Sequence, residues 1–181
     1  LVAGIYTAQV TDDNGCIEEQ TFLVDQPAEP VTIADTSGNI SCFGGNDGFI
    51  DITVTGGNGG YTYDWSNAAL TEDLSDLFIG VYIVEVEDSN GCFASDTITL
   101  TQPLAPLSIT TEMTAVLCFG ESNGIASVEA SGGTAPYSYL WSNGETTDTI
   151  TGLPIGDYTI VVTDSLGCID SATVTVTEPP L

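Results

Sequence analysis

The sequence predicts an all-β protein built from small tandem β-sandwiches, and three observations support this prediction. One motif recurs at a fixed interval of 76 residues, so that residues 4–16 return as residues 80–92 and again as residues 156–168. Apolar side chains alternate with polar ones along short runs, and helical spacing appears nowhere. Turn-forming pairs such as Gly56-Gly57 and Asn143-Gly144 separate these runs. A long and strict period of this kind indicates repeated domains of one type.

Prolines mark the predicted domain boundaries. A Gln-Pro or Glu-Pro step begins at residues 26, 102 and 178, and a further proline follows each step within a few residues. Two nearby prolines stiffen a linker and remove backbone donors from it. We therefore expect residues 1–30 to be the C-terminal part of a truncated repeat, and residues 31–106 and 107–181 to be two β-sandwich repeats. On this interpretation the chain is a segment of a longer array.

Each strand of the first complete repeat follows from its own alternation. Residues 49–55 place Ile and Val on one face, residues 61–65 place two Tyr and a Trp on one face, and the runs 82–86 and 98–100 do the same with apolar residues. Six or seven short strands in about 76 residues make a small sandwich. Six strands would return both termini to one end. We therefore expect either an extra short strand near residues 68–71 or a crossing between the sheets in residues 31–42.

Composition excludes several functions. The chain has no Lys, Arg or His and 26 Asp and Glu, which gives a formal charge of -26. Nucleic acid and anionic membrane surfaces attract basic proteins, so neither is an expected partner. Without His or Lys no ordinary side chain titrates near neutrality to act as a general base, and we expect no catalytic residues. No apolar run of 18 residues exists, so we expect no direct insertion into a membrane.

The residues before two tyrosines resemble a known corner motif. Residues 77–82 and 153–158 fit the pattern Leu-x-x-Gly-x-Tyr of fibronectin type III and related immunoglobulin-like domains, where the Tyr hydroxyl bonds back to the backbone. The resemblance implies a structural role for Tyr6, Tyr82 and Tyr158 and an immunoglobulin-like sandwich.

The two tryptophans allow two interpretations. Trp65 and Trp141 stack on a sugar if they face outward, or they are the buried tryptophan of the third strand of an immunoglobulin-like sandwich. Their alternation with tyrosines favours burial.

The five cysteines allow several pairings. If one strand separates the Trp65 strand from the Tyr82 strand, the turns that hold Cys42 and Cys92 fall at the same end of the sandwich. This geometry favours disulfides within each repeat, Cys42 to Cys92 and Cys118 to Cys168, as small secreted domains commonly have. Cys16 then lacks a partner. The alternatives are bridges across the junctions, Cys16 to Cys42 and Cys92 to Cys118, or free buried thiols.

Acidic turn residues are candidate ligands for weak calcium binding, because calcium prefers several oxygen ligands. The candidates are Asp12, Asp13, Asp47, Asp88 and Asp164. The competing interpretation is that Asp, Asn and Gly simply form turns. No EF-hand pattern is present, and a zinc site is not indicated because the chain has neither CxxC nor His. We expect no other cofactor.

Five hydroxyl or amide side chains are glycosylation candidates. Asn39 begins an Asn-x-Ser acceptor pattern. Thr97, Thr149, Ser165 and Ser171 each follow an Asp and precede an apolar residue, and these triplets resemble sites of bacterial O-glycosylation.

Three motifs in a fixed order give the chain a family resemblance. Residues 42–48 read Cys-Phe-Gly-Gly-Asn-Asp-Gly, residues 56–67 end in Tyr-x-Tyr-x-Trp-Ser-Asn, and residues 80–92 run from Gly-x-Tyr to Gly-Cys. Together they resemble the SprB repeat of very large surface adhesins of gliding bacteria. The resemblance implies secretion by the type IX system to the bacterial cell surface and a role in a filamentous adhesin for surface adhesion and gliding motility.

Two functions fit such an array. The first is a structural stalk, whose partners are neighbouring repeats of the same chain. The second is a multivalent array that binds glycans or surfaces through weak contacts. Burial of Trp65 and Trp141 would favour the stalk, and exposed aromatic residues repeated every 76 residues would favour the binder.

Overall fold

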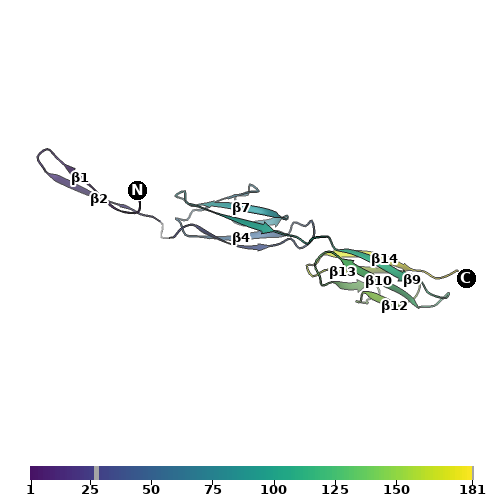
Figure 1. Ribbon diagram of the computed structural model, residues 1–181. Helices are drawn as coiled ribbons and strands as arrows, with labels where there is room; N and C mark the ends of the chain where they lie inside the picture. Colours follow the sequence, from purple (N-terminus) through teal and green to yellow (C-terminus); the bar gives the residue numbers. More distant parts are fainter. Residues whose placement is uncertain (27–28, 181) are drawn as a thin grey trace. The chain divides into compact units, whose positions relative to one another are not determined.

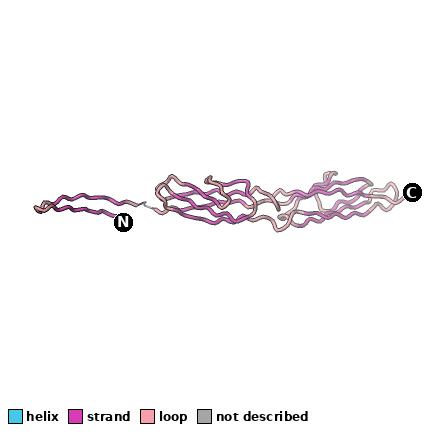
Figure 2. The backbone as a smooth tube through the Cα atoms, turned by 90° about the horizontal axis from the view of Figure 1, so that it is seen from above, coloured by secondary structure: helices cyan, strands magenta, loops and turns pink. Residues whose placement is uncertain are grey.

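The structure is a computed structural model that describes residues 1–26 and 29–180, and these residues form fourteen β-strands (Figure 1). The backbone coloured by secondary structure shows only strands and loops (Figure 2). Among the described residues, no helix long and apolar enough to cross a membrane occurs.

The first two strands form a separate hairpin. β1 (Gly4–Thr11) and β2 (Ile17–Val24) pair antiparallel along their whole length. They correspond, 76 residues earlier, to the last two strands of the first complete repeat. Val10 and Phe22 are 68% and 52% exposed, although the equivalent Val86 and Ile98 are buried. The reason is that β1 and β2 form a two-stranded sheet by themselves, whereas β7 and β8 pack against a second sheet.

Each complete repeat contains six strands in two three-stranded sheets. The first repeat comprises β3 (Thr32–Gly38), β4 (Gly48–Thr55), β5 (Thr62–Trp65), β6 (Leu74–Leu77), β7 (Gly80–Glu87) and β8 (Phe93–Leu100). The second comprises β9 (Ser108–Thr114), β10 (Gly124–Ser131), β11 (Ser138–Trp141), β12 (Thr149–Leu153), β13 (Gly156–Thr163) and β14 (Ile169–Val176).

The sheet order identifies the sandwich. The first repeat has sheets β3-β4-β6 and β5-β7-β8, and the second has the equivalent sheets β9-β10-β12 and β11-β13-β14. These are the A-B-E and C-F-G sheets of an immunoglobulin-like sandwich without strand D. The all-β prediction of tandem immunoglobulin-like sandwiches with a 76-residue period is confirmed. The proposed boundaries at residues 30 and 106 stay a prediction.

The strand directions of the second repeat follow from its pairing and two further hydrogen bonds. The Ile109 amide, in β9, donates to Asp170 Oδ2 at the start of β14, at 3.1 Å. The Val116 amide, just after β9, donates to the Thr177 carbonyl just after β14, at 3.0 Å. β9 and β14 therefore run in the same direction. β10 is antiparallel to β9 and β12, and β13 is antiparallel to β11 and β14, so four strands run one way and two run the other.

This arrangement corrects the expectation about the termini. Residues 142–148, which contain no strand, carry the chain from β11 to β12 in the other sheet without reversing its direction. The repeat therefore starts at one end of the sandwich and finishes at the other. In the first repeat residues 66–73 make the same connection, and they contain no extra strand. The termini therefore reach opposite ends of the sandwich without either predicted feature, which was a strand near residues 68–71 or a crossing between the sheets in residues 31–42.

The core of the second repeat lies between its two sheets. Ala126 and Ile150 face it from one sheet, and Trp141, Ile160 and Val162 face it from the other, each at most 3% exposed. The first repeat buries the equivalent positions. Burying one such aliphatic side chain stabilises the fold by about 1.5 to 3 kcal/mol.

The two tryptophans also hold the connecting segments. Trp65 Nε1 donates to the Thr71 carbonyl at 2.8 Å, and Trp141 Nε1 donates to the Thr147 carbonyl at 2.9 Å. Each indole thus anchors the segment that crosses between the sheets, and its buried N–H is satisfied.

Candidate functional site

The three corner tyrosines make one contact three times. The hydroxyls of Tyr6, Tyr82 and Tyr158 each donate to the carbonyl four residues upstream, at 2.8, 3.0 and 3.2 Å respectively. This is the bond of a tyrosine corner, which fixes the entry into the strand that follows. These side chains serve the fold.

The tryptophans are not available for stacking on a ligand. Trp65 and Trp141 are 2% and 1% exposed. A sugar ring needs an open aromatic face, and here the core covers both faces. Of the two interpretations of Trp65 and Trp141, burial in the core, which the alternation favoured, agrees with the structure, and the alternative of ligand-stacking residues does not.

Two buried aspartates organise the turns at one end of each repeat. Asp164 Oδ1 accepts the amides of Leu166 and Cys168, both at 2.9 Å, and its Oδ2 accepts the Thr134 amide at 2.8 Å. Asp88 accepts the three equivalent amides in the first repeat, each at 2.9 Å. Asp88 and Asp164 are only 4% and 5% exposed, respectively, and the turns close around them.

Hydrogen bonds from these amides lower the pKa of both aspartates. The Cys92 amide makes the largest contribution to holding the pKa of Asp88 below its usual value. Burial raises the pKa of Asp164, but the backbone N–H groups of Thr134, Cys168 and their neighbours together outweigh it, and the net pKa is lowered. Both carboxylates are therefore ionised near neutrality and act as fixed acceptors.

The five calcium candidates do not form one cluster. Within residues 1–26 and 29–180, no group of three or more His, Cys, Asp or Glu side chains is arranged to hold a metal ion. Asp12 Oδ1 accepts the amides of Asn14 and Cys16. Asp47 accepts the Ser41 amide at 3.0 Å, and hydrogen bonds from Ser41 lower its pKa. Four of the five candidates, all but Asp13, thus accept backbone amides, and weak calcium binding by these side chains stays a prediction.

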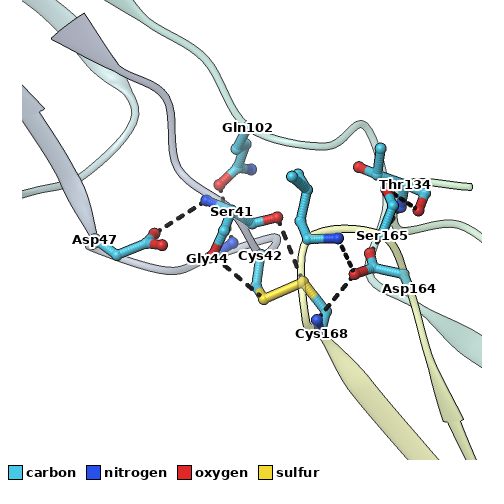
Figure 3. Close-up of a disulfide and its surroundings, with 10 residues drawn as sticks. Ser41, Cys42, Gly44, Asp47, Gln102, Thr134, Asp164, Ser165 and Cys168 are labelled. Atoms are coloured by element: carbon cyan, nitrogen blue, oxygen red, sulfur yellow. Dashed lines mark hydrogen bonds between the residues drawn. A yellow bond between two sulfur atoms is a disulfide. The ribbon is translucent and has the colours of Figure 1, made fainter.

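The structure pairs the cysteines differently from every alternative drawn from the sequence. Cys42 bonds to Cys168, with the two Cα atoms 5.7 Å apart (Figure 3). Cys16, Cys92 and Cys118 are exposed free thiols. The predicted bridges within each repeat, Cys42 to Cys92 and Cys118 to Cys168, are therefore not the bridges of this structure.

The strand directions explain this correction. Cys168 immediately precedes β14, whereas the loop of Cys118 is bonded to residues just after β14. The eight residues of β14 span about 26 Å at the rise of a strand. Because a disulfide needs Cα atoms within about 7 Å, two cysteines at opposite ends of one sandwich cannot bond.

Hydrogen bonds hold the loop that presents Cys42. The Ser41 amide donates to Asp47 Oδ1, and the Gly44 amide donates to Gln102 Oε1 at 2.9 Å (Figure 3). Cys168 Sγ lies 3.3 Å from the Ser41 carbonyl oxygen, and Cys168 is only 9% exposed. Both cysteines belong to one compact unit, made of residues 36–51, 73–82 and 97–181. The separation of 126 residues is one period of 76 plus the 50 residues between Cys42 and Cys92, so the spacing allows this pairing but does not single it out.

The glycosylation candidates all lie on the surface. Asn39, Thr97, Thr149, Ser165 and Ser171 are exposed. Asn39 Oδ1 also accepts the Thr101 amide at 2.7 Å. Exposure is required for modification, and the modification itself stays a prediction.

The strand order, the corner tyrosines and the buried tryptophans define a protein of tandem immunoglobulin-like sandwiches. The family model described as "SprB repeat" matches residues 34–70 and 110–146. The chain contains two SprB repeats, a repeat found in gliding-motility surface adhesins. No curated protein matches the chain.

Two solved structures are similar to the chain at low sequence identity. The N-terminal eight Ig domains of Down Syndrome Cell Adhesion Molecule are 15% identical over 98% of this chain, with a TM-score of 0.49. The C-terminal 282-residue fragment of intimin, in complex with the intimin-binding domain of its translocated receptor, is 16% identical over 82% of this chain, with a TM-score of 0.46. The chain spans 28% and 64% of the lengths of these two proteins. The fold assignment rests on the strand order of the chain itself.

Proposed function

We propose that the two repeats are structural stalk segments of a very large, secreted, filamentous adhesin that serves surface adhesion and gliding motility. The SprB match at both repeats is the observation that carries this proposal. The side chains that stand out in the sequence support it, because the tryptophans, the corner tyrosines and the two buried aspartates all bond to the repeat's own backbone. We infer that the chain is not an enzyme.

Charge and disulfide chemistry support an extracellular stalk. A chain with 26 acidic residues and no Lys, Arg or His repels its own copies and resists lateral association. Disulfides persist in oxidising compartments, in agreement with an extracellular position on the bacterial cell surface. We propose export by the type IX system, as the family resemblance implies.

One observation favours a second function, multivalent binding to glycans or surfaces. Phe43 and Phe119 are 47% and 57% exposed and lie one period of 76 residues apart. An exposed aromatic ring that recurs in each repeat could supply a weak contact that an array multiplies.

Binding of the whole 181-residue chain to a glycan array and to abiotic surfaces, with and without calcium, tests both functions. The stalk predicts no binding under any of these conditions. Binding that disappears in Phe43→Ser/Phe119→Ser, but survives in Leu70→Ser/Leu104→Ser, would establish the second function and overturn the passive stalk. The control removes two apolar side chains that are 73% and 100% exposed but do not recur. Binding that only calcium permits would also overturn the stalk, and would support calcium sites in the turns.

A further inference from the structure

The five cysteines fall into two structural classes, at opposite ends of a repeat. We call Cys42 and Cys118 the leading cysteines, because each precedes the second strand of its repeat. We call Cys16, Cys92 and Cys168 the trailing cysteines, because each lies in the last hairpin turn. The disulfide of the structure joins the leading cysteine of one repeat to the trailing cysteine of the next.

We propose that this pairing is a rule of the array: the leading cysteine of every repeat bonds to the trailing cysteine of the following repeat. The exposed thiols of Cys92 and Cys118 are then half-sites, and the partner of each is the complementary cysteine of another SprB repeat. The partner lies 126 residues earlier for Cys92 and 126 residues later for Cys118, as for the observed pair. The rule does not depend on whether the array is a stalk or a binder.

The free leading cysteine is held in the same way as the bonded one. In the Cys118 loop the Leu117 amide donates to Asn123 Oδ1 at 3.0 Å, and the Gly120 amide donates to Glu178 Oε2 at 3.1 Å. These bonds repeat those of the Cys42 loop, with Asn in place of Asp and Glu in place of Gln. Two different pairs of side chains thus maintain one loop geometry, and the loop at Cys118 is already arranged for bonding.

The trailing cysteines are likewise equivalent. In all three turns the cysteine amide donates to Oδ1 of the aspartate four residues earlier, at 2.8 to 2.9 Å. In all three the amide of that aspartate donates back to the cysteine carbonyl, at 2.9 to 3.0 Å. The turn of Cys168 therefore owes its form to the aspartate and not to the disulfide, since Cys16 and Cys92 have the same form without a bond.

The bonded trailing cysteine and a free trailing cysteine differ in solvent exposure. Cys168, which bonds to Cys42, is 9% exposed, whereas Cys92 is an exposed thiol. A hollow of about 400 Å³, lined by Val31, Gly57 and Phe93 among others, lies beside Cys92. We assign this hollow to the leading-cysteine loop of a preceding repeat.

Bond formation is an oxidation of two thiols. Each new bridge joins two Sγ atoms and releases two protons and two electrons. Oxidised glutathione accepts the two protons and the two electrons and is released as two molecules of reduced glutathione. The reaction passes through a mixed disulfide between the protein and glutathione.

Thiol counting and disulfide mapping on the 181-residue chain test the observed pair. After oxidation with oxidised glutathione, the rule predicts three free thiols and one bridge, whereas pairing within repeats predicts one free thiol and two bridges. Trypsin cannot be used because the chain has no Lys or Arg, but cleavage at Asp and Glu places all five cysteines in different peptides. Recovery of a Cys42 to Cys92 or Cys118 to Cys168 peptide would overturn the rule.

A longer chain tests the rule at a new junction. The whole chain is extended at its C-terminus by a second copy of residues 106–181. We expect two bridges, Cys42 to Cys168 and Cys118 to the trailing cysteine of the added copy, with three thiols still free. In a Cys118→Ser version of the extended chain the added trailing cysteine should become free while the first bridge remains. The first bridge is an internal control for folding, so a Cys118 that stays free beside it would overturn the proposal.

Discussion

Replacing Asp164 by asparagine removes one half of a buried acceptor while keeping its shape. The amide oxygen can still accept the N–H groups of Leu166 and Cys168, but an NH₂ group then faces the Thr134 amide, where Oδ2 accepts at 2.8 Å. One charge-assisted hydrogen bond is lost, and a partly buried N–H keeps no acceptor. A hydrogen bond to a charged group contributes about 1.5 to 3 kcal/mol, so we expect the second repeat to lose about 2 kcal/mol or more.

Urea unfolding at neutral pH, followed by tryptophan fluorescence, measures this loss. With an m-value of about 1 kcal/mol per M for a domain of this size, the midpoint of the second repeat should fall by about 2 M. Asp148→Asn is the matched control, because Asp148 is exposed and an exposed substitution changes stability by less than about 0.5 kcal/mol. Equal midpoints for the two variants would refute the role assigned to the Asp164 carboxylate.

The same pair of proteins has a defined pH dependence. The pKa of Asp164 is lowered from its ordinary value of 3.8 in the folded chain, so its stabilisation is fully present above about pH 4 and is lost as the pH falls through the folded pKa. Protonated aspartate resembles asparagine. The stability difference between the wild type and Asp164→Asn should therefore shrink below about pH 4, and a difference that grows with acidity would contradict the assignment.

Three further substitutions test the packing of the second repeat by thermal unfolding. Trp141→Phe removes the bond to the Thr147 carbonyl and leaves space in the core, and should cost about 2 to 4 kcal/mol; a loss below about 1 kcal/mol would contradict the anchoring role of the indole. Tyr158→Phe should lower the stability by about 1 kcal/mol and Tm by about 4 to 8 °C, and an unchanged Tm would show that the corner bond contributes nothing. Gly132→Ala should destabilise more than Gly144→Ala. Both glycines have positive φ, but only at Gly132 would a Cβ lie 2.0 Å from a proline carbonyl oxygen, so equal losses would mean that the close approach is unimportant.

The period-two pattern predicted most of the fold because burial in a sandwich follows strand alternation directly. Alternation placed Trp65 with other inward residues, and its 2% exposure agrees with that placement. The corner motif likewise placed the hydroxyl of Tyr82, since the bond reaches only four residues upstream. Both inferences use local sequence, where a strand or a turn determines which way a side chain points.

The direction of the chain across the sandwich could not be predicted in this way. Residues 66–73 pass from one sheet to the other without a strand and without a net reversal, and the bond that holds them, from Trp65 to the Thr71 carbonyl, forms only in the folded repeat. Counting one reversal of direction for each strand therefore placed the later strands in the wrong direction. This error put Cys42 and Cys92 at the same end of the sandwich, and the predicted disulfides within each repeat were wrong for that reason.

The corrected strand directions mean that the cysteines connect two repeats and do not reinforce a single sandwich. A bridge inside a repeat would reinforce a sandwich whose core already contains a buried tryptophan and paired sheets. The observed bridge instead links the loop before β4 to the turn before β14, across the Pro103 and Pro106 linker that joins the two repeats. A two-proline linker limits backbone rotation but cannot fix a joint by itself, because every non-proline residue in it keeps two free dihedrals. The Cys42 to Cys168 disulfide adds a second, covalent connection between the two repeats and so restricts that rotation. For the stalk proposed above, a bridge at the joint between repeats is more useful than one inside a sandwich, and the Cys42 to Cys168 bond joins two repeats.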